Sequence, residues 1–425
     1  MRITKELNER LTRVGPGTPM GEVFRRYWVP ACLAEELPDP DGAPIRVRLL
    51  GEDLVAFRDT AGDVGLVDAY CAHRKAPLFY GRNEECGLRC VYHGWKYDVQ
   101  GNCVDMPSEP PYSKFRLRVS IKAYPTHEAG GIVWTYMGPQ ERMPAPPDYE
   151  WLRAPTTHVR VSKTDEPCNF MQTIEGGIDT AHSSFAHNND IGNPRLLRSL
   201  DTHPRLEVDV RDHGFTYASI RNIRDDTTYL RVYQFMMPFQ QSRGGLLDWE
   251  GKPAKLPSIH GHVWMPADDE NTHVYNFMYA SEESHPISDD FWENQESRMG
   301  RGKEHYIEGT YGLKARPEND FYIDRQVQRE KTFTGIEGIN TQDFALQTGM
   351  GRIVDRSTEA LGSTDMAIQT ARRLLLEAAD EVAAGRDPRG VEPESHRESR
   401  GADLLVPRGS DWRDVSKAAT YAHWR

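Results

Sequence analysis

Two short cysteine–histidine pairs constrain this chain more than any other feature. One residue separates Cys71 from His73, two residues separate Cys90 from His93, and Gly94-Trp95 follows directly. Sixteen residues, 74–89, lie between the two pairs. Two thiolates and two imidazoles form the ligand set of a metal centre held by four side chains. The surrounding chain is therefore expected to fold as two similar loops that face each other.

Two kinds of metal centre use this ligand set. Tetrahedral zinc accepts two cysteines and two histidines, but zinc sites usually pair Cys with Cys and His with His along the chain. A Rieske [2Fe–2S] cluster takes two cysteines on one iron and two histidines on the other. Because each loop here supplies one residue of each kind, the spacing favours the cluster. Zinc, or four unrelated residues in a β-rich region, are the alternatives.

Composition and charge argue against several classes of partner. The formal charge is 52 − 64 = −12, so the chain is a poor candidate for binding nucleic acid or an anionic membrane. No run approaches the roughly 18 apolar residues of a membrane span, and the N-terminus lacks the apolar core of a signal peptide. The other four of the six cysteines have no paired spacing, which predicts reduced thiols in a cytoplasmic protein.

Hydrophobic patterning predicts an α+β fold with two domains. Short strands with turns are expected from about residue 29 to 133, before a proline-rich linker at 144–155 and a helical stretch from 167 to about 186. Further strands are expected at 205–210, 215–221, 228–236, 261–265 and 272–280, followed by a mainly helical region at 289–330 and a helix at 365–384. Residues 386–425 are expected to wrap the surface. We predict an N-terminal segment 1–25 packed with the larger domain, a small all-β metal domain 26–143, and a larger domain 150–425.

A second metal site is indicated near the start of the larger domain. Asp179 and His182 are three residues apart and would share a helical face, but His182 and His187 would point about 140° apart. The two imidazoles can converge only if the helix bulges or ends between them. Two histidines and one carboxylate form the facial triad of non-haem Fe(II) oxygenases. Asp343, a lone acid in a mostly uncharged segment, is the best candidate for a further ligand. The alternative is a set of surface or capping histidines.

With both sites in view, the chain resembles the oxygenase (α) component of Rieske non-haem iron aromatic ring-hydroxylating oxygenases, in the phthalate dioxygenase-like branch. The matching stretches are 14–21, 25–28, 71–95, 175–187, 338–343, 349–357 and 361–365. The resemblance implies a Rieske domain followed by a catalytic domain of the helix-grip type, with an antiparallel sheet flanked by helices.

The resemblance also implies a role for each candidate ligand. Cys71 and Cys90 would hold the iron of the cluster that stays ferric, and His73 and His93 the reducible iron. His182, His187 and Asp343 would hold a mononuclear Fe(II). Asp179 would not bind metal. It would link the cluster of one subunit to the mononuclear iron of its neighbour, in a homotrimer or stacked trimers.

The activity implied by the resemblance is that of a terminal oxygenase. It would use O2 to hydroxylate an aromatic carboxylate, by phthalate-like ring cis-dihydroxylation. Alternatives are O-demethylation of a methoxylated acid of the vanillate or dehydrodivanillate type and, more remotely, a Rieske electron carrier without oxygenase activity. The sequence shows neither a dinucleotide-binding glycine motif nor plant-type ferredoxin spacing. Electrons from NAD(P)H would therefore arrive through a partner reductase with a flavin and a ferredoxin-type cluster.

Substrate-binding residues are less constrained by the sequence. Arg205, Arg221 and Arg231 lie on strands that line the pocket in the family, and a buried arginine facing a cavity suits a carboxylate. Arg205 and Arg231 are the candidates for binding substrate, although surface ion pairs would also account for them. His260 and His262 alternate onto one face of a strand and are interpreted as pocket or surface residues.

Overall fold

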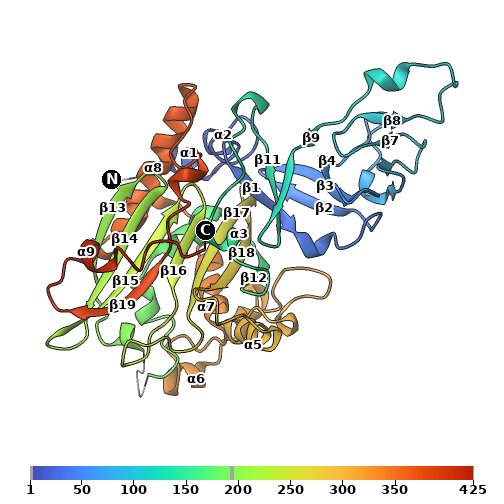
Figure 1. The fold of residues 1–425 in the computed structure, drawn as a ribbon. Helices are drawn as coiled ribbons and strands as arrows, with labels where there is room; N and C mark the ends of the chain where they lie inside the picture. Colours follow the sequence, from blue (N-terminus) through green and yellow to red (C-terminus); the bar gives the residue numbers. More distant parts are fainter. Residues whose placement is uncertain (1–2, 192–195, 425) are drawn as a thin grey trace.

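A computed structural model describes residues 3–191 and 196–424 of the chain. Residues 1–2, 192–195 and 425, which fall within the predicted N-terminal segment and larger domain, lie outside the described residues. The small domain stands beside the larger one, and the large sheet carries helices on its inner side (Figure 1). This arrangement agrees with the predicted α+β class.

Three small antiparallel sheets build the part of the chain that carries the two cysteine–histidine loops. They are β1-β11-β10, β2-β3-β4-β9 and β5-β6-β7-β8. The strands are β1 (Trp28–Leu33), β2 (Ile45–Leu49), β3 (Glu52–Arg58), β4 (Val64–Asp68), β5 (Arg82–Asn83), β6 (Leu88–Arg89), β7 (Lys96–Tyr97), β8 (Cys103–Asp105), β9 (Ala123–Tyr124), β10 (Thr126–Ala129) and β11 (Ile132–Tyr136). A separate core, which includes Val55, Phe57, Leu88 and Tyr97, lies beneath the loops.

One eight-stranded antiparallel sheet forms the larger domain, in the order β12-β18-β17-β16-β15-β14-β13, with β19 paired to β15. Its strands are β12 (Val159–Glu166), β13 (Arg205–Arg211), β14 (Gly214–Asn222), β15 (Thr227–Met236), β16 (Gln240–Gly244), β17 (Ser258–Asp268), β18 (Asn271–Ala280) and β19 (Ala402–Pro407). The predicted strands are confirmed. The sequence analysis missed β12, β16 and β19, and β19 shows that residues 386–425 do not only wrap the surface.

Strand register defines an inner and an outer face of this sheet. On β14, Phe215 and Tyr217 join the main core, whereas Ala218 contributes to a second cluster with Trp412 on the opposite face. Tyr217 stacks on Tyr233 of β15 at 4.6 Å between ring centroids. Alternate residues on β14 and β15 therefore face the metal-binding side, as period-two alternation requires.

Nine α-helices are present among the described residues, and several of them cover the inner face. They are α1 (Lys5–Thr12), α2 (Pro19–Phe24), α3 (Glu150–Arg153), α4 (Phe170–Ile178), α5 (Asp289–Met299), α6 (Arg325–Glu330), α7 (Ile339–Gly349), α8 (Met366–Ala383) and α9 (Trp412–Ser416). The predicted helix at 365–384 is confirmed as α8, which buries Ala371, Leu374, Leu375 and Ala378 on one face. No described helix is long and apolar enough to cross a membrane.

Two glycines let α4 lie against its neighbours. A Cβ on Gly177 would stand 2.0 Å from the Trp264 ring of β17, and one on Gly176 would stand 2.2 Å from Nε2 of Gln347 on α7. Only glycine allows so close an approach, which brings the end of α4 next to α7. Near the N-terminus, Phe24 of α2 contacts Phe170 of α4 at 5.1 Å between centroids. The division of the chain into 1–25, 26–143 and 150–425 stays a prediction.

Candidate metal centres

The two cysteine–histidine loops have the same backbone turn. The N–H groups of Lys75 and Gly94 donate to the carbonyls of Cys71 and Cys90, each at 2.9 Å. Lys75 and Gly94 both have a positive φ, of 58° and 79°. The matched turns bury both cysteines and leave His73 exposed, with the rings of His73 and His93 4.4 Å apart between centroids.

The donors of these loops fit a two-iron cluster better than a single ion. Ligands of one tetrahedral zinc, each about 2.0–2.3 Å from the metal, stand about 3.3–3.8 Å apart. A single ion would draw at least three ligand atoms together. Among the described His, Cys, Asp and Glu side chains, three ligand atoms lie within 4.8 Å of one another at His182, His187 and Asp343, and not at the two loops. Spread donors with thiolates on one side and imidazoles on the other suit [2Fe–2S].

The second site forms where α4 ends. The structure ends α4 at Ile178, so the helical stretch expected to reach about residue 186 is shorter than predicted. Asp179 is extended, with φ −65° and ψ 132°, and His182 begins a separate 3₁₀ turn, η5 (His182–Ser184). Because His182 and His187 no longer lie on one continuous helix, their imidazoles can converge despite the five-residue spacing. This is the helix break that the sequence analysis expected.

Asp343, on α7, completes a compact triad with the two histidines. The Nε2 atoms of His182 and His187 are 3.2 Å apart, and Oδ1 of Asp343 lies 3.5 Å from the first and 3.2 Å from the second. Neighbouring donors about 2.1 Å from one octahedral ion stand about 3 Å apart. The described donors therefore fit one face of a six-coordinate ion and leave the opposite positions open.

Side chains around the triad hold its imidazoles in the binding orientation. Gln342 donates its amide nitrogen to Asn189 and to the Ile336 carbonyl, so its Oε1 accepts from Nδ1 of His187 at 2.9 Å. The Nε2 lone pair of His187 is thereby aimed at the site. On the other side, Oδ2 of Asp179 lies 3.5 Å from Nδ1 of His182.

Electrostatics keep both carboxylates of this region ionised. Burial opposes ionisation of Asp343, but the charges of His187, His182 and Arg243 outweigh it and lower the pKa of Asp343 below its usual value. Burial likewise opposes ionisation of Asp179, and hydrogen bonding from His182 lowers its pKa. A charged Asp343 is the form that binds a metal.

The two arginines expected to bind substrate do not have the expected surroundings. Arg205 pairs across the ladder with Ile220, which packs in the outer cluster, so Arg205 lies on the outer face. Its side chain is 68% exposed and pairs with Glu207. The expectation that Arg205 lines a pocket is therefore wrong, because the strand register sets it on the opposite face from Arg231.

Arg231 is buried on the inner face, but its charge is already compensated. Its Nε lies 2.9 Å from Oδ2 of Asp403, which β19 brings beside β15. A guanidinium held by a buried carboxylate has little capacity left to bind a second one. Arg221 is also buried and donates to Ser219 and to the carbonyls of Thr180 and Asp201, so it supports the Asp179–His182 turn.

Two other arginines, which the sequence analysis did not select, have no counter-ion in the described part of the chain. Among the described residues, no carboxylate lies within ion-pair distance of Arg198, in η6 (Leu197–Ser199), or of Arg243, on β16. Burial and the charge of Arg231 lower the pKa of each to about 10. The charge of Arg198 acts on His182, and the charge of Arg243 acts on Asp343.

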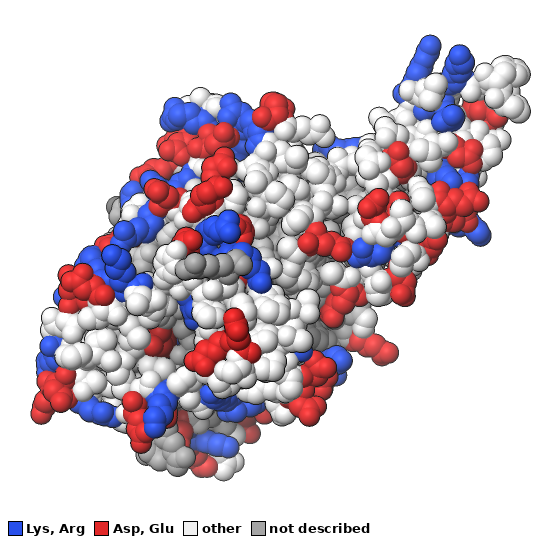
Figure 2. Space-filling view, viewed as in Figure 1, with Lys and Arg blue, Asp and Glu red and all other residues white. Residues whose placement is uncertain are grey.

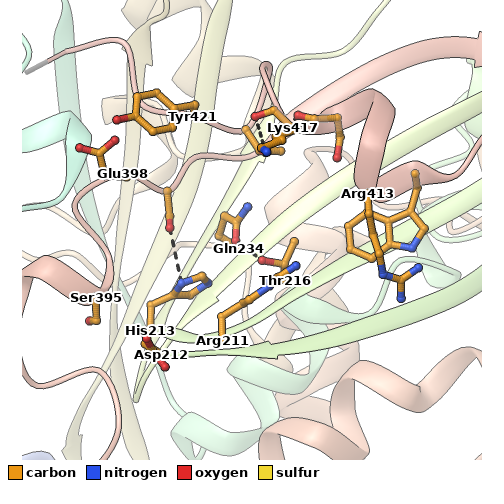
Figure 3. Close-up of a pocket in the computed structure, with 14 residues that line it drawn as sticks. Arg211, Asp212, His213, Thr216, Gln234, Ser395, Glu398, Arg413, Lys417 and Tyr421 are labelled. Carbon is orange, nitrogen blue, oxygen red and sulfur yellow. Dashed lines mark hydrogen bonds between the residues drawn. The ribbon is translucent and has the colours of Figure 1, made fainter.

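Two cavities lie away from the triad. One of about 430 Å³ opens between the β13–β14 hairpin and the C-terminal segment, with His213, Gln234 and Lys417 at its walls (Figure 3). Another of about 820 Å³ is lined by Glu166, Phe321 and Phe344. None of the predicted site residues lines either cavity.

Comparisons with known proteins agree with this geometry. Residues 27–125 match the Rieske [2Fe-2S] domain model, and residues 135–424 match the "LigXa C-terminal domain like" model. The oxygenase subunit of phthalate 4,5-dioxygenase from Pseudomonas putida is 39% identical, with 99% of this chain and 96% of that protein covered. The oxygenase subunit of 5,5'-dehydrodivanillate O-demethylase from Sphingobium sp. (strain NBRC 103272 / SYK-6) is 34% identical, with 92% and 83% covered.

The fold is also similar to that of NdmA from Pseudomonas putida CBB5, at a TM-score of 0.60, 17% identity and coverage of 92% of this chain and all of that one. The Rieske loops, the iron-type triad and the full-length similarity converge on one family. This chain belongs to the oxygenase subunits of Rieske non-haem iron oxygenases, in the branch that includes the phthalate 4,5-dioxygenase subunit.

Proposed function

We propose that this chain is a terminal oxygenase that hydroxylates an aromatic carboxylate, using O2 and electrons from a partner reductase. The observation that carries the proposal is a pair of arginines, the buried Arg198 and the half-buried Arg243, which act electrostatically on the triad and have no ion-pair partner among the described residues. A buried cation without a counter-ion is costly, and a bound carboxylate would remove that cost. The name of one relative, the oxygenase subunit of phthalate 4,5-dioxygenase, supports the same substrate class.

Aromatic side chains on the same inner face suit the ring of such a substrate. Tyr217 and Tyr233 stack with their ring planes 5° apart, and His262 lies 5.5 Å from Trp264 on β17. Stacking and edge contacts of this kind hold a flat ring in one orientation. The carboxylate would then fix the ring's in-plane position through the two guanidiniums.

We assign roles to the metal-binding side chains on their geometry and residue type. Cys71, His73, Cys90 and His93 would hold the cluster, and His182, His187 and Asp343 the mononuclear iron. When bound, these groups would store the incoming electron and activate O2 beside the substrate. The chain's own side chains position the reactants: Gln342 fixes the His187 ring, and the Asp179 carboxylate lies 3.5 Å from Nδ1 of the His182 ring.

A ring of three subunits, or stacked rings, would bring the two centres of neighbouring chains together. Both centres carry exposed apolar side chains at their rims. Val91 and Tyr92, beside His93, are 58% and 56% exposed, and Phe185 and Phe333 near the triad are 44% and 52% exposed. Apolar rims at both sites favour burial against another copy. Asp179 would link the two centres across that contact.

Electrons would come from NAD(P)H through a reductase that carries a flavin and a ferredoxin-type cluster. All six cysteines stand free of disulfides, which favours a reducing cytoplasm.

The test of this function uses the anaerobically reconstituted protein with a reductase and a panel of aromatic acids. We expect about three irons per chain and substrate-dependent O2 uptake with benzoates or phthalates. Two irons per chain and no uptake would instead indicate an electron carrier. A colourless protein without acid-labile sulfide would indicate zinc.

O-demethylation of a methoxylated aromatic acid is the second candidate, supported by the 34% identical O-demethylase subunit. Both reactions would use the same carboxylate-binding arginines. Labelled O2 separates them, because ring dioxygenation leaves both oxygen atoms in a cis-dihydrodiol, whereas demethylation releases formaldehyde.

A further inference from the structure

A long arm projects from the small domain beyond sheet β5-β6-β7-β8. It comprises residues 106–118 and ends in a 3₁₀ turn, η3 (Phe115–Arg118) (Figure 1). The arm exposes apolar surface, since Tyr112 is 85% exposed and Leu117 is 69% exposed. An arm of this kind has no core of its own, and its exposed apolar surface suits contact with another protein.

The arm carries three cations and one carboxylate, that of Glu109, so it is net positive. Lys114, Arg116 and Arg118 are all exposed, and across the described part of the chain no carboxylate pairs with any of them. Blue atoms accordingly gather at the end of the arm in Figure 2. The whole chain has a net charge of −12, so this is a local reversal of sign. Such a surface attracts an acidic partner and repels a basic one.

The base of the arm lies beside a ligand of the cluster site. The ring of Phe115 meets the edge of Trp95 at 6.0 Å, and Trp95 stacks on His73 at 4.5 Å with planes 14° apart. The Trp95 indole is held in place by donating to Ser108 on the arm at 2.9 Å. A protein bound to the arm would therefore sit next to His73.

We propose that the 106–118 arm is the docking surface for the acidic [2Fe–2S] ferredoxin-type domain of the electron donor. The proposal rests on the proposed function, which requires such a donor. In each encounter one electron would pass from the reduced donor cluster to the oxidised cluster of this chain, with no bond made or broken. Attraction between the arm and the donor would raise the rate of productive encounters.

The experiment compares two triple variants with the same change of charge. In the arm variant, Lys114→Glu, Arg116→Glu and Arg118→Glu are combined. In the control, Lys252→Glu, Lys303→Glu and Arg386→Glu reverse exposed cations on the larger domain. The probe is a plant-type [2Fe–2S] ferredoxin of net negative charge. Binding of its oxidised form is measured by titration, and cluster reduction by its reduced form is followed in stopped flow.

At 20 mM salt we expect the arm variant to bind ferredoxin at least 10-fold more weakly than wild type and to be reduced at least 10-fold more slowly. Control and wild type should agree within about twofold. In 0.5 M salt the differences should shrink, because the Debye length falls to a few ångströms. Reduced methyl viologen, a small cation, should reduce the arm variant at least as fast as wild type, which shows an intact cluster.

Equal ferredoxin affinity in the two triple variants would overturn the proposal. So would loss of the wild-type oligomer by the arm variant in sedimentation, since the arm would then contact a second copy of this chain. Neither readout depends on substrate. Failure to oxygenate any aromatic acid, with normal reduction by ferredoxin, would reject the proposed function and leave the docking surface standing.

Discussion

Arg243→Met tests directly whether the unpaired guanidinium binds a substrate carboxylate. Arg243 has no ion-pair partner among the described residues, and its hydrogen bond to Oε1 of Gln241, at 3.5 Å, is long. Its pKa falls from 12.5 to about 10 through burial and the charge of Arg231. That shift corresponds to about 3 kcal/mol by which the site disfavours the bare cation.

A substrate carboxylate that restores the counter-ion would recover most of this energy. Loss of about 3 kcal/mol corresponds to roughly a 100-fold fall in kcat/KM for an aromatic acid. The same substitution removes a half-buried charge that has no ion-pair partner among the described residues, so the free energy of unfolding should stay level or rise. Lost activity in the variant would then not reflect unfolding.

The assay is O2 uptake with an aromatic acid and with its neutral amide, at matched reductase. Arg205→Met, which removes the same charge from the outer face, is the control and should leave both kcat/KM values within about twofold. The reasoning is refuted if Arg243→Met lowers kcat/KM for the acid and the amide equally, or if Arg205→Met has the larger effect on the acid.

Three further changes test other parts of the structure. Tyr97→Phe removes the hydroxyl 3.2 Å from Sγ of Cys71 and should lower the reduction potential of the reconstituted cluster by roughly 40–90 mV in a spectroscopic titration, since hydrogen bonds to the thiolate favour the reduced state. Gly177→Ala sets a methyl group against Trp264 and should lower the free energy of unfolding, measured in urea, by about 1–3 kcal/mol. It should also lower the iron content. The control Gly349→Ala, which has open space around it, should change neither quantity. His213→Asn should make the free energy of unfolding fall less steeply as the pH is lowered. Burial lowers the His213 pKa to about 4, so the unfolded chain alone gains this proton between about pH 6.5 and pH 4, at a cost of about 3 kcal/mol that Asn would not incur.

The shapes of the two candidate metal sites could be predicted because their signals are local. Each cysteine–histidine loop is closed by its own backbone turn, in which Lys75 and Gly94 occupy equivalent positions. The spacing of His182 and His187 was sufficient to predict a break in the helix, although not that α4 ends four residues before His182. The strands with strong period-two patterns were also found. The short strand β16 was missed because it alternates weakly, and Arg243 was missed with it.

The arginines proposed to bind substrate could not be identified in the same way, because compensation of charge is a tertiary property. Arg231 and Arg243 are equally plausible from sequence, and both lie on the inner face. Only the return of the chain as β19, more than 170 residues later, gives Asp403 to Arg231 and leaves Arg243 without a partner. The strand register decides which face of the sheet Arg205 occupies. If Arg205 paired one residue further along β14, its side chain would face the metal site. The choice of arginine proposed to bind substrate therefore depends on which carboxylates the rest of the fold has already placed, and Arg243 is proposed because no described carboxylate pairs with it.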